Sequence, residues 1–212
     1  MDKQKILTNT EQWISERFSA DTTGHDLWHM KRVVRLAKHI AYQEKADPFI
    51  CQLAAYLHDV SDEKLVNDVD TSIQEIFTFL TNEGVEEKDR HAVWRAIKDV
   101  SFKGNHTIPE KMEGKVVQDA DRLDALGAIG IARTFAYGGS QKNKLFDPNS
   151  PNTLEQMDYR NPAKTTIDHF YEKLLKLKNL MNTESAKEIA EDRHQFMEQF
   201  LARFYAEWNG DD

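Results

Sequence analysis

Several features that are common in proteins are scarce or missing in this sequence of 212 residues. Cys51 is the single cysteine, which excludes an internal disulfide and is typical of a protein from a reducing compartment. No apolar run approaches the length of a membrane span, and the first residues lack the apolar core of a secretory signal. We therefore expect a cytoplasmic protein that does not cross a membrane.

Basic residues are also fewer than acidic ones, which gives a formal net charge of −8 at pH 7. An acidic surface repels nucleic acid polymers and anionic membranes, so neither is an expected partner. A small anionic ligand remains compatible with this charge, since a metal ion and a few basic side chains can reverse the field locally.

The common catalytic signatures are missing as well. The sequence contains no phosphate-binding GxxxxGK[ST] loop, no glycine-rich dinucleotide turn, no HExxH and no CxxC pair. Cys51 lies among Ile50, Leu53 and Ala54 without an activating base beside it, which disfavours a nucleophilic cysteine. Any chemistry should therefore depend on histidine and carboxylate side chains.

Apolar residues recur at helical spacing, and the short alternating runs that form hairpins are missing, which predicts an all-α protein. We expect one domain over residues 1–212, built as a helical bundle. The predicted helices span about residues 3–18, 26–43, 48–58, 72–80, 86–100, 113–135, 165–181 and 185–208. Gly127 and Gly130 predict a bend or break in the sixth helix. The glycines, prolines and polar residues of 137–163 predict a long exposed loop.

Three segments place histidine or aspartate among residues that should be buried: GHDLWHMKRV (24–33), YLHDVSD (56–62) and VVQDADRLDALG (116–127). His29 and His58 share the apolar faces of their helices, and Asp121 is flanked by Ala120 and Leu123. One inward histidine is more often a satisfied core residue than a ligand. A buried carboxylate is costly unless it is paired or binds a cation, so the set as a whole favours a metal site.

The ordered pattern His29, His58-Asp59, Asp121 resembles the HD-domain superfamily of metal-dependent phosphohydrolases. HMKRVVRLA resembles the H-x-x-R-V helix of that family, and LAAYLHDVSD resembles its helix that ends in the HD pair. VVQDADRLDALGAIGIAR resembles the closing D-R-L segment of small single-domain bacterial members. The resemblance covers a motif core of about residues 25–133, before the loop at 137–163 and the C-terminal helices at 165–208.

The resemblance implies a helical bundle around one divalent metal ion (Mn, Fe, Co, Ni, Mg or Zn). It implies His29, His58, Asp59 and Asp121 as ligands, with Asp119 as the competitor of Asp121. Many relatives carry a water-activating Glu three residues after the HD pair. This sequence has Asp62 there, with Glu63 next to it, so a catalytic Asp62 and a solvated Asp62 both remain open.

Other residues near the motifs are candidates for supporting roles. His25 could be a ligand one turn before His29, a residue that orients the site, or a helix cap. Phosphate-binding candidates are Arg32, Lys103 and Arg122, each with a surface ion pair as the alternative. A second metal would need additional histidines as ligands. The only candidates are His91 and His106, and we expect a site for one metal.

The implied activity is hydrolysis of a phosphate ester or anhydride of a nucleotide, as in a nucleoside triphosphate pyrophosphohydrolase or a nucleotidase. The alternative is a non-catalytic sensor that binds metal and nucleotide, and a di-iron oxygenase is less favoured. The aromatic residues Phe204, Tyr205 and Trp208 on the last helix could pack internally or against a second subunit. We expect a homodimer.

Overall fold

The computed structural model describes residues 1–18, 26–62, 68–100, 107–149 and 165–211. The regular structure in these ranges is helical, which confirms the all-α prediction. Close contacts group the chain into two compact units, residues 1–121 and residues 122–212. The expectation that the chain forms one domain stays a prediction.

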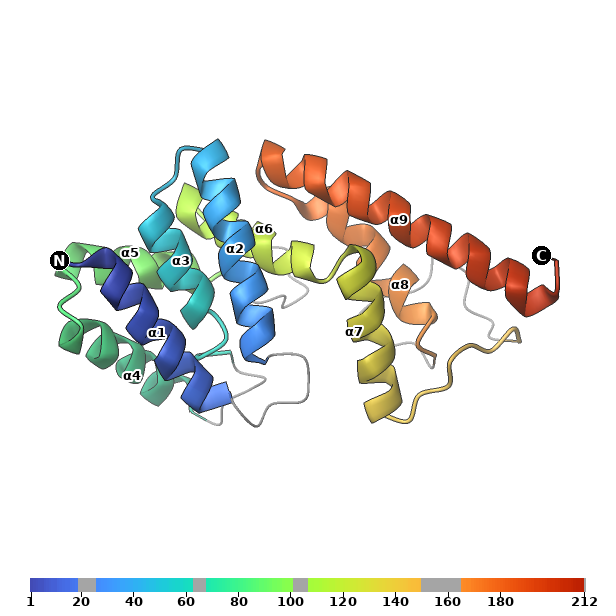
Figure 1. Ribbon diagram of the computed structural model, residues 1–212, viewed down its shortest axis with the longest axis horizontal. Helices are drawn as coiled ribbons and strands as arrows, with labels where there is room; N and C mark the ends of the chain where they lie inside the picture. Colours follow the sequence, from blue (N-terminus) through green and yellow to red (C-terminus); the bar gives the residue numbers. More distant parts are fainter. Residues whose placement is uncertain (19–25, 63–67, 101–106, 150–164, 212) are drawn as a thin grey trace. The chain divides into compact units, whose positions relative to one another are not determined.

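The first unit is formed by the N-terminal helices (Figure 1). They are α1 (Lys3–Phe18), α2 (Leu27–Gln43), α3 (Pro48–Leu57), α4 (Val69–Asn82), α5 (Glu87–Ile97) and α6 (Met112–Asp124), whose last residues belong to the second unit. Each corresponds to a predicted helix. The helix α4 begins earlier than predicted because the Asp68 side chain caps it, accepting a hydrogen bond from the backbone N–H of Thr71 at 3.1 Å.

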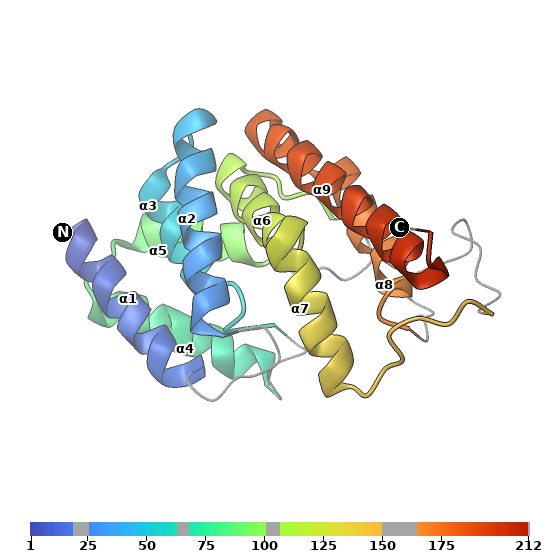
Figure 2. The same ribbon diagram turned by 45° about the vertical axis from the view of Figure 1, so that its right-hand side comes forward.

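The helices α2 and α3 pack against each other in the centre of the first unit, and α1 and α5 pack on α3 (Figure 2). Asp47 begins α3 by accepting hydrogen bonds from the N–H groups of Phe49 and Ile50, and Pro48 occupies its first turn. Leu53 on α3 and Ile40 on α2 are fully buried. Burial of a side chain of this size contributes about 1.5–3 kcal/mol, so this helix pair anchors the unit.

The predicted helix over 113–135 is interrupted, as its glycines indicated. The helix α6 ends at Asp124, and α7 (Gly127–Ser140) begins after two intervening residues. Gly127 has φ +69°, a left-handed conformation that favours glycine. The N-terminal part of the predicted loop, up to Ser140, belongs to α7, residues 141–145 are exposed, and residues 150–164 lie outside the described ranges.

The prediction of one α-helix over 165–181 is wrong. This segment contains a short helix α8 (Asp168–Glu172) and a 3₁₀ helix, η1 (Leu174–Leu180). The reason is the leucine spacing: Leu174 and Leu177 are buried and Leu180 follows at the same interval of three. An interval of three places side chains on one line of a 3₁₀ helix, which has three residues per turn.

The last helix, α9 (Glu184–Asn209), packs against α7 and η1 in the second unit. Aromatic rings line this packing, with Phe200 5.8 Å from Phe135 and 5.9 Å from Phe170, measured between ring centroids. Phe146 contacts Phe204, Tyr205 and Trp208 near the end of α9. These rings therefore pack within the chain, and the homodimer stays a prediction. None of the helices in the described ranges has both the length and the apolar character that a membrane crossing requires.

Candidate metal centre

The first turn of α2 positions His29. Asp26 precedes the helix, and its Oδ1 atom accepts a hydrogen bond from the backbone N–H of His29 at 2.8 Å. This cap satisfies an amide that would otherwise have no intrahelical partner, and it determines where the helix starts. The side chain of His29 is 1% exposed, so the helix start delivers an imidazole into the interior of the first unit.

The end of α3 positions His58 and Asp59. The last helical residue is Leu57, His58 is the C-cap, and the chain then turns, with the N–H of Val60 donating to the carbonyl oxygen of Leu57 at 3.1 Å. Adjacent side chains in a helix diverge by about 100°, following from 3.6 residues per turn. Ending the helix here lets both side chains point toward one place.

The ring of His58 is oriented by the backbone. Its Nδ1 atom lies 2.9 Å from the carbonyl oxygen of Ala55, an acceptor, so Nδ1 carries the proton in this contact. The Nε2 lone pair of the neutral ring is therefore available to a cation. A backbone carbonyl has no sequence signal, and this contact could not be predicted from the residues.

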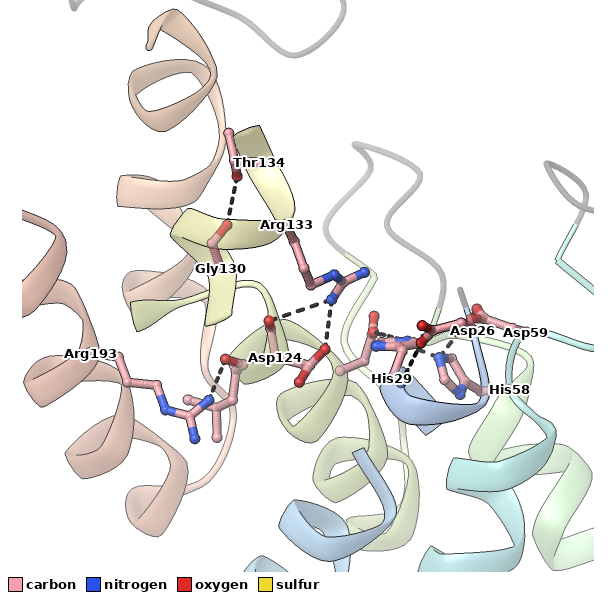
Figure 3. A network of polar contacts seen from close by, with 11 residues as sticks. Asp26, His29, His58, Asp59, Asp124, Gly130, Arg133, Thr134 and Arg193 are labelled. Carbon is pink, nitrogen blue, oxygen red and sulfur yellow. Dashed lines mark hydrogen bonds and ion pairs between the residues drawn. The ribbon is translucent and has the colours of Figure 1, made fainter. Parts of the chain in front are cut away.

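The side chains of His29, His58 and Asp59 lie close together (Figure 3), and Asp121 joins them through its contacts with both histidines. The Nε2 atom of His29 lies 3.6 Å from Oδ2 of Asp59 and 3.5 Å from Oδ1 of Asp121, which α6 contributes. The Nε2 atom of His58 lies 3.2 Å from Oδ1 of Asp59 and 3.7 Å from Oδ1 of Asp121. We call His29, His58, Asp59 and Asp121 the quartet.

The chemistry of the quartet fits a divalent cation. Ligand atoms of His29, His58 and Asp121 lie within 4.8 Å of one another, as ligands around one ion do. The Nε2 atom of His58 is buried and makes no hydrogen bond of normal geometry, a costly arrangement that coordination of a cation relieves. Two imidazoles and two carboxylates form a mixed nitrogen and oxygen set suited to first-row transition metals.

The carboxylates also control protonation in the quartet. Burial by itself lowers the pKa of His58, but the nearby carboxylates of Asp59 and Asp121 outweigh burial and raise this pKa to about 10. The negative charge that holds a proton on His58 would equally attract a metal ion, and an ion would displace that proton.

The structure distinguishes the three aspartates of α6. Asp121 belongs to the quartet, and its side chain is 26% exposed. Asp119 is fully buried, and the group of ligand atoms within 4.8 Å of one another in the described residues takes its carboxylate from Asp121. Asp59 is outside that group and joins the quartet through its contacts with both histidines. Asp124 forms an ion pair with Arg133 in the second unit, where its Oδ2 atom lies 2.7 Å from Nη1 of Arg133 (Figure 3). The geometry therefore favours Asp121 over Asp119 as a ligand.

The other predicted site residues have different environments. Asp62 is half-buried in the turn after Asp59, and its N–H donates to the carbonyl oxygen of Asp59 at 3.2 Å. Arg32 is half-buried on α2, while Arg122 is buried and donates from Nη1 to the carbonyl oxygen of Leu180. Their catalytic and phosphate-binding roles stay predictions.

Several remaining candidates are not part of the quartet. His25, Lys103 and His106 lie outside the described residues. His91 is exposed on α5, and its Nε2 atom lies 3.9 Å from Oε1 of Glu87. Burial raises the pKa of the Cys51 thiol far above its usual range, which agrees with the prediction that this cysteine is not a nucleophile.

A surface groove of about 660 Å³ lies at the other end of α2 and α3 from the quartet. It is lined by Lys38 and Tyr42 near the end of α2 and by Pro48 and Phe49 at the start of α3. The quartet belongs to the opposite helix ends. This groove is therefore not part of the candidate metal centre.

Comparison with known proteins gives concordant matches. Residues 27–126 match the family model of the HD domain. The uncharacterized protein YpgQ of Bacillus subtilis is 39% identical, over 98% of both chains. A crystal structure described as an HD-superfamily hydrolase from Bacillus thuringiensis is 42% identical, with a TM-score of 0.80 and 98% of both chains covered. The structure of Bacillus subtilis YpgQ in complex with ADP has a TM-score of 0.79 at 35% identity, covering 97% of this chain and all of YpgQ.

Proposed function

Because the chain belongs to the HD-domain family, we propose that it is a metal-dependent phosphohydrolase acting on a nucleotide or a related phosphate ester or anhydride. The observation that carries this proposal is the convergence of the quartet, in which Nε2 of each histidine lies 3.2–3.7 Å from an Oδ atom of each aspartate. The HD-superfamily hydrolase from Bacillus thuringiensis and the ADP complex of YpgQ support the reaction class and the nucleotide.

The quartet would hold one divalent cation through Nε2 of the two histidines and one oxygen of each aspartate. When bound, the cation supplies Lewis acidity, polarising a phosphoryl oxygen and lowering the pKa of water. Four protein ligands would leave open positions on the ion, which water and a phosphate oxygen could occupy. A binding module that performs no reaction does not need these open positions, which favours the enzyme over the sensor.

Differences in exposure indicate the side from which substrate reaches the quartet. The side chains of His29, His58 and Asp59 are 1%, 3% and 5% exposed, whereas that of Asp121 is 26% exposed. The buried members exclude water from their side, which strengthens their electrostatic interaction with the ion. Substrate and water therefore approach past Asp121.

Asp62 is the proposed proton acceptor for the attacking water. It follows the HD pair by three positions and lies in the turn whose backbone is tied to Asp59. Its half-buried carboxylate is within the same segment as two members of the quartet. General base catalysis of this kind contributes about 10²–10⁴-fold to a rate.

The activity is tested with a panel of nucleoside mono-, di- and triphosphates, each assayed with Mn²⁺, Mg²⁺, Co²⁺ and Ni²⁺. Release of phosphate, pyrophosphate or triphosphate identifies the bond that is cut. Asp59→Asn is the matched inactive control, because it removes a ligand charge at nearly constant volume. Absence of turnover for every nucleotide at full metal occupancy would overturn the proposal, and nucleotide binding without turnover would favour the sensor.

A further inference from the structure

The helix α1 contributes an acidic residue, Glu11, that contacts both helices of the central pair. The Oε1 atom of Glu11 lies 2.7 Å from Nζ of Lys31 on α2. Its Oε2 atom accepts a hydrogen bond of 2.7 Å from the hydroxyl of Tyr56 on α3. One carboxylate therefore joins α2 to α3 through its two oxygens, and Figure 1 shows α1 lying against this pair.

The two partners of Glu11 flank the histidines of the quartet. Lys31 follows His29 by two positions on α2, and Tyr56 precedes His58 by two positions on α3. The contacts of Glu11 are thus at the same level along the helix pair as the two imidazoles, whose ring centroids are 5.5 Å apart.

The contacts of Glu11 combine a hydrogen bond from a buried tyrosine with a part-exposed ion pair. Tyr56 is 6% exposed, and a buried hydroxyl without a partner costs about 1–3 kcal/mol. Two hydrogen bonds lower the pKa of Glu11, the one from Lys31 having the larger effect and the one from Tyr56 the smaller. The carboxylate is therefore charged at neutral pH. The Nζ atom of Lys31 also lies 5.1 Å from the ring centroid of Trp28, beside His29.

Hydrogen bonds and ion pairs of fixed length add a directional constraint to the apolar packing between two helices. A functional constellation must be held within about 0.5 Å of its productive geometry. If α2 slides along α3 by more than such a distance, the 2.7 Å contacts of Tyr56 and Lys31 with one carboxylate must lengthen, or these side chains must change rotamer.

We propose that Glu11 is a positioning residue for the metal centre, tying Lys31 to Tyr56 so that His29 and His58 face the same cation. The proposal rests on the metal centre of the proposed function and assigns a role to a residue outside the family motifs. Glu11 does not contact the ion or the substrate and acts through the relative position of α2 and α3.

The test is the affinity for Mn²⁺, measured by isothermal titration calorimetry on the full chain. Outer contacts that orient metal ligands are worth about 10–100-fold in affinity, and Glu11→Ala should weaken Mn²⁺ binding by about tenfold. The matched control is Glu75→Ala, which breaks the 2.6 Å ion pair that joins Arg17 on the same helix α1 to α4. That variant should bind Mn²⁺ within about twofold of the unchanged chain.

Two further variants separate positioning from loss of fold. Tyr56→Phe and Lys31→Met each remove one contact of Glu11, and each should weaken Mn²⁺ binding by about threefold while the thermal unfolding midpoint in chelator stays near that of Glu75→Ala. The visible absorption of the Co²⁺-loaded protein should shift in Glu11→Ala and not in Glu75→Ala, because only the former alters the ligand geometry.

Wild-type Mn²⁺ affinity in both Glu11→Ala and Tyr56→Phe would overturn the positioning role while leaving the metal centre in place. If the unchanged chain itself binds no Mn²⁺, the metal centre fails, and the positioning role fails with it. If Glu75→Ala weakens Mn²⁺ binding as much as Glu11→Ala does, the effect comes from loosening α1 in general. That result would also overturn the proposal.

Discussion

The Nε2 atom of His29 on α2 lies 3.5 Å from the Oδ1 atom of Asp121 on α6. These residues come from the first and last motif segments of the sequence, and His58 and Asp59 from the middle segment complete the quartet. Because α2 and α3 pack together in the core of the first unit, folding of that unit brings the histidines into one place. The core thus determines the geometry of the candidate metal centre.

Removing one ligand should abolish metal retention and preserve the helices. His58→Ala and Asp59→Ala each delete a donor, and three remaining ligands should hold the ion at least tenfold more weakly. Metal content after dialysis, measured by mass spectrometry, and helical content, measured by circular dichroism, test this. His91→Ala is the matched control, because His91 is 53% exposed on α5. Full metal retention in both quartet variants would remove the basis for the metal centre.

Asp62→Asn should separate catalysis from metal binding. The substitution removes the proposed proton acceptor and keeps the volume, so kcat should fall by about 10²–10⁴-fold with Mn²⁺ affinity unchanged within about twofold. Asp70→Asn, in the first turn of α4, is the control and should leave kcat unchanged. An unchanged kcat in Asp62→Asn would place proton transfer on another group.

Metal binding should depend on pH with a defined sign. The pKa of His58 is raised from 6.5 to about 10, so its proton stabilises the fold fully below pH 6.5, and that contribution is lost as pH rises toward 10. A cation needs the neutral ring, so its affinity should rise about tenfold per pH unit between pH 6.5 and 8. Titrations in buffers of different ionisation enthalpy should detect about one released proton, and an affinity independent of pH would contradict this.

Two adjacent glycines of α7 should respond in opposite ways to alanine. A Cβ atom at Gly138 would lie 2.2 Å from Oγ1 of Thr166, whereas one at Gly139 would have no neighbour within 4 Å. Gly138→Ala should destabilise the protein by about 1–3 kcal/mol through overpacking. Gly139→Ala should be neutral or stabilising by up to about 1 kcal/mol, because alanine favours a helix. Urea unfolding measures both, and equal effects would contradict the close packing at Gly138.

The helices of the first unit could be predicted from the sequence because each has a regular apolar pattern and an evident start, as at Asp47-Pro48. The interruption after Asp124 was indicated by Gly127, which takes a conformation that favours glycine. The prediction for residues 165–181 is wrong because a spacing of three residues between apolar side chains occurs in α-helices as well as in 3₁₀ helices. The leucines of this segment repeat that spacing, and the segment forms a 3₁₀ helix.

His29, His58 and Asp121 could be selected from the sequence because polar residues stand on otherwise apolar helix faces, and the resemblance to the HD-domain superfamily added Asp59. The contacts that orient them could not be predicted. The carbonyl of Ala55 that accepts from His58 has no side-chain signal, and Glu11 meets Lys31 and Tyr56 only after three helices have packed. Such contacts depend on tertiary structure and leave no periodic pattern in the chain.

Anomalous X-ray scattering at the manganese edge tests whether the quartet binds a single divalent cation. Crystals of the unchanged chain grown with Mn²⁺ should show one anomalous peak within bonding distance of Nε2 of His29, Nε2 of His58 and the carboxylates of Asp59 and Asp121. A chain that binds Mn²⁺ in solution but shows its peak elsewhere, with none between these four side chains, would contradict the account.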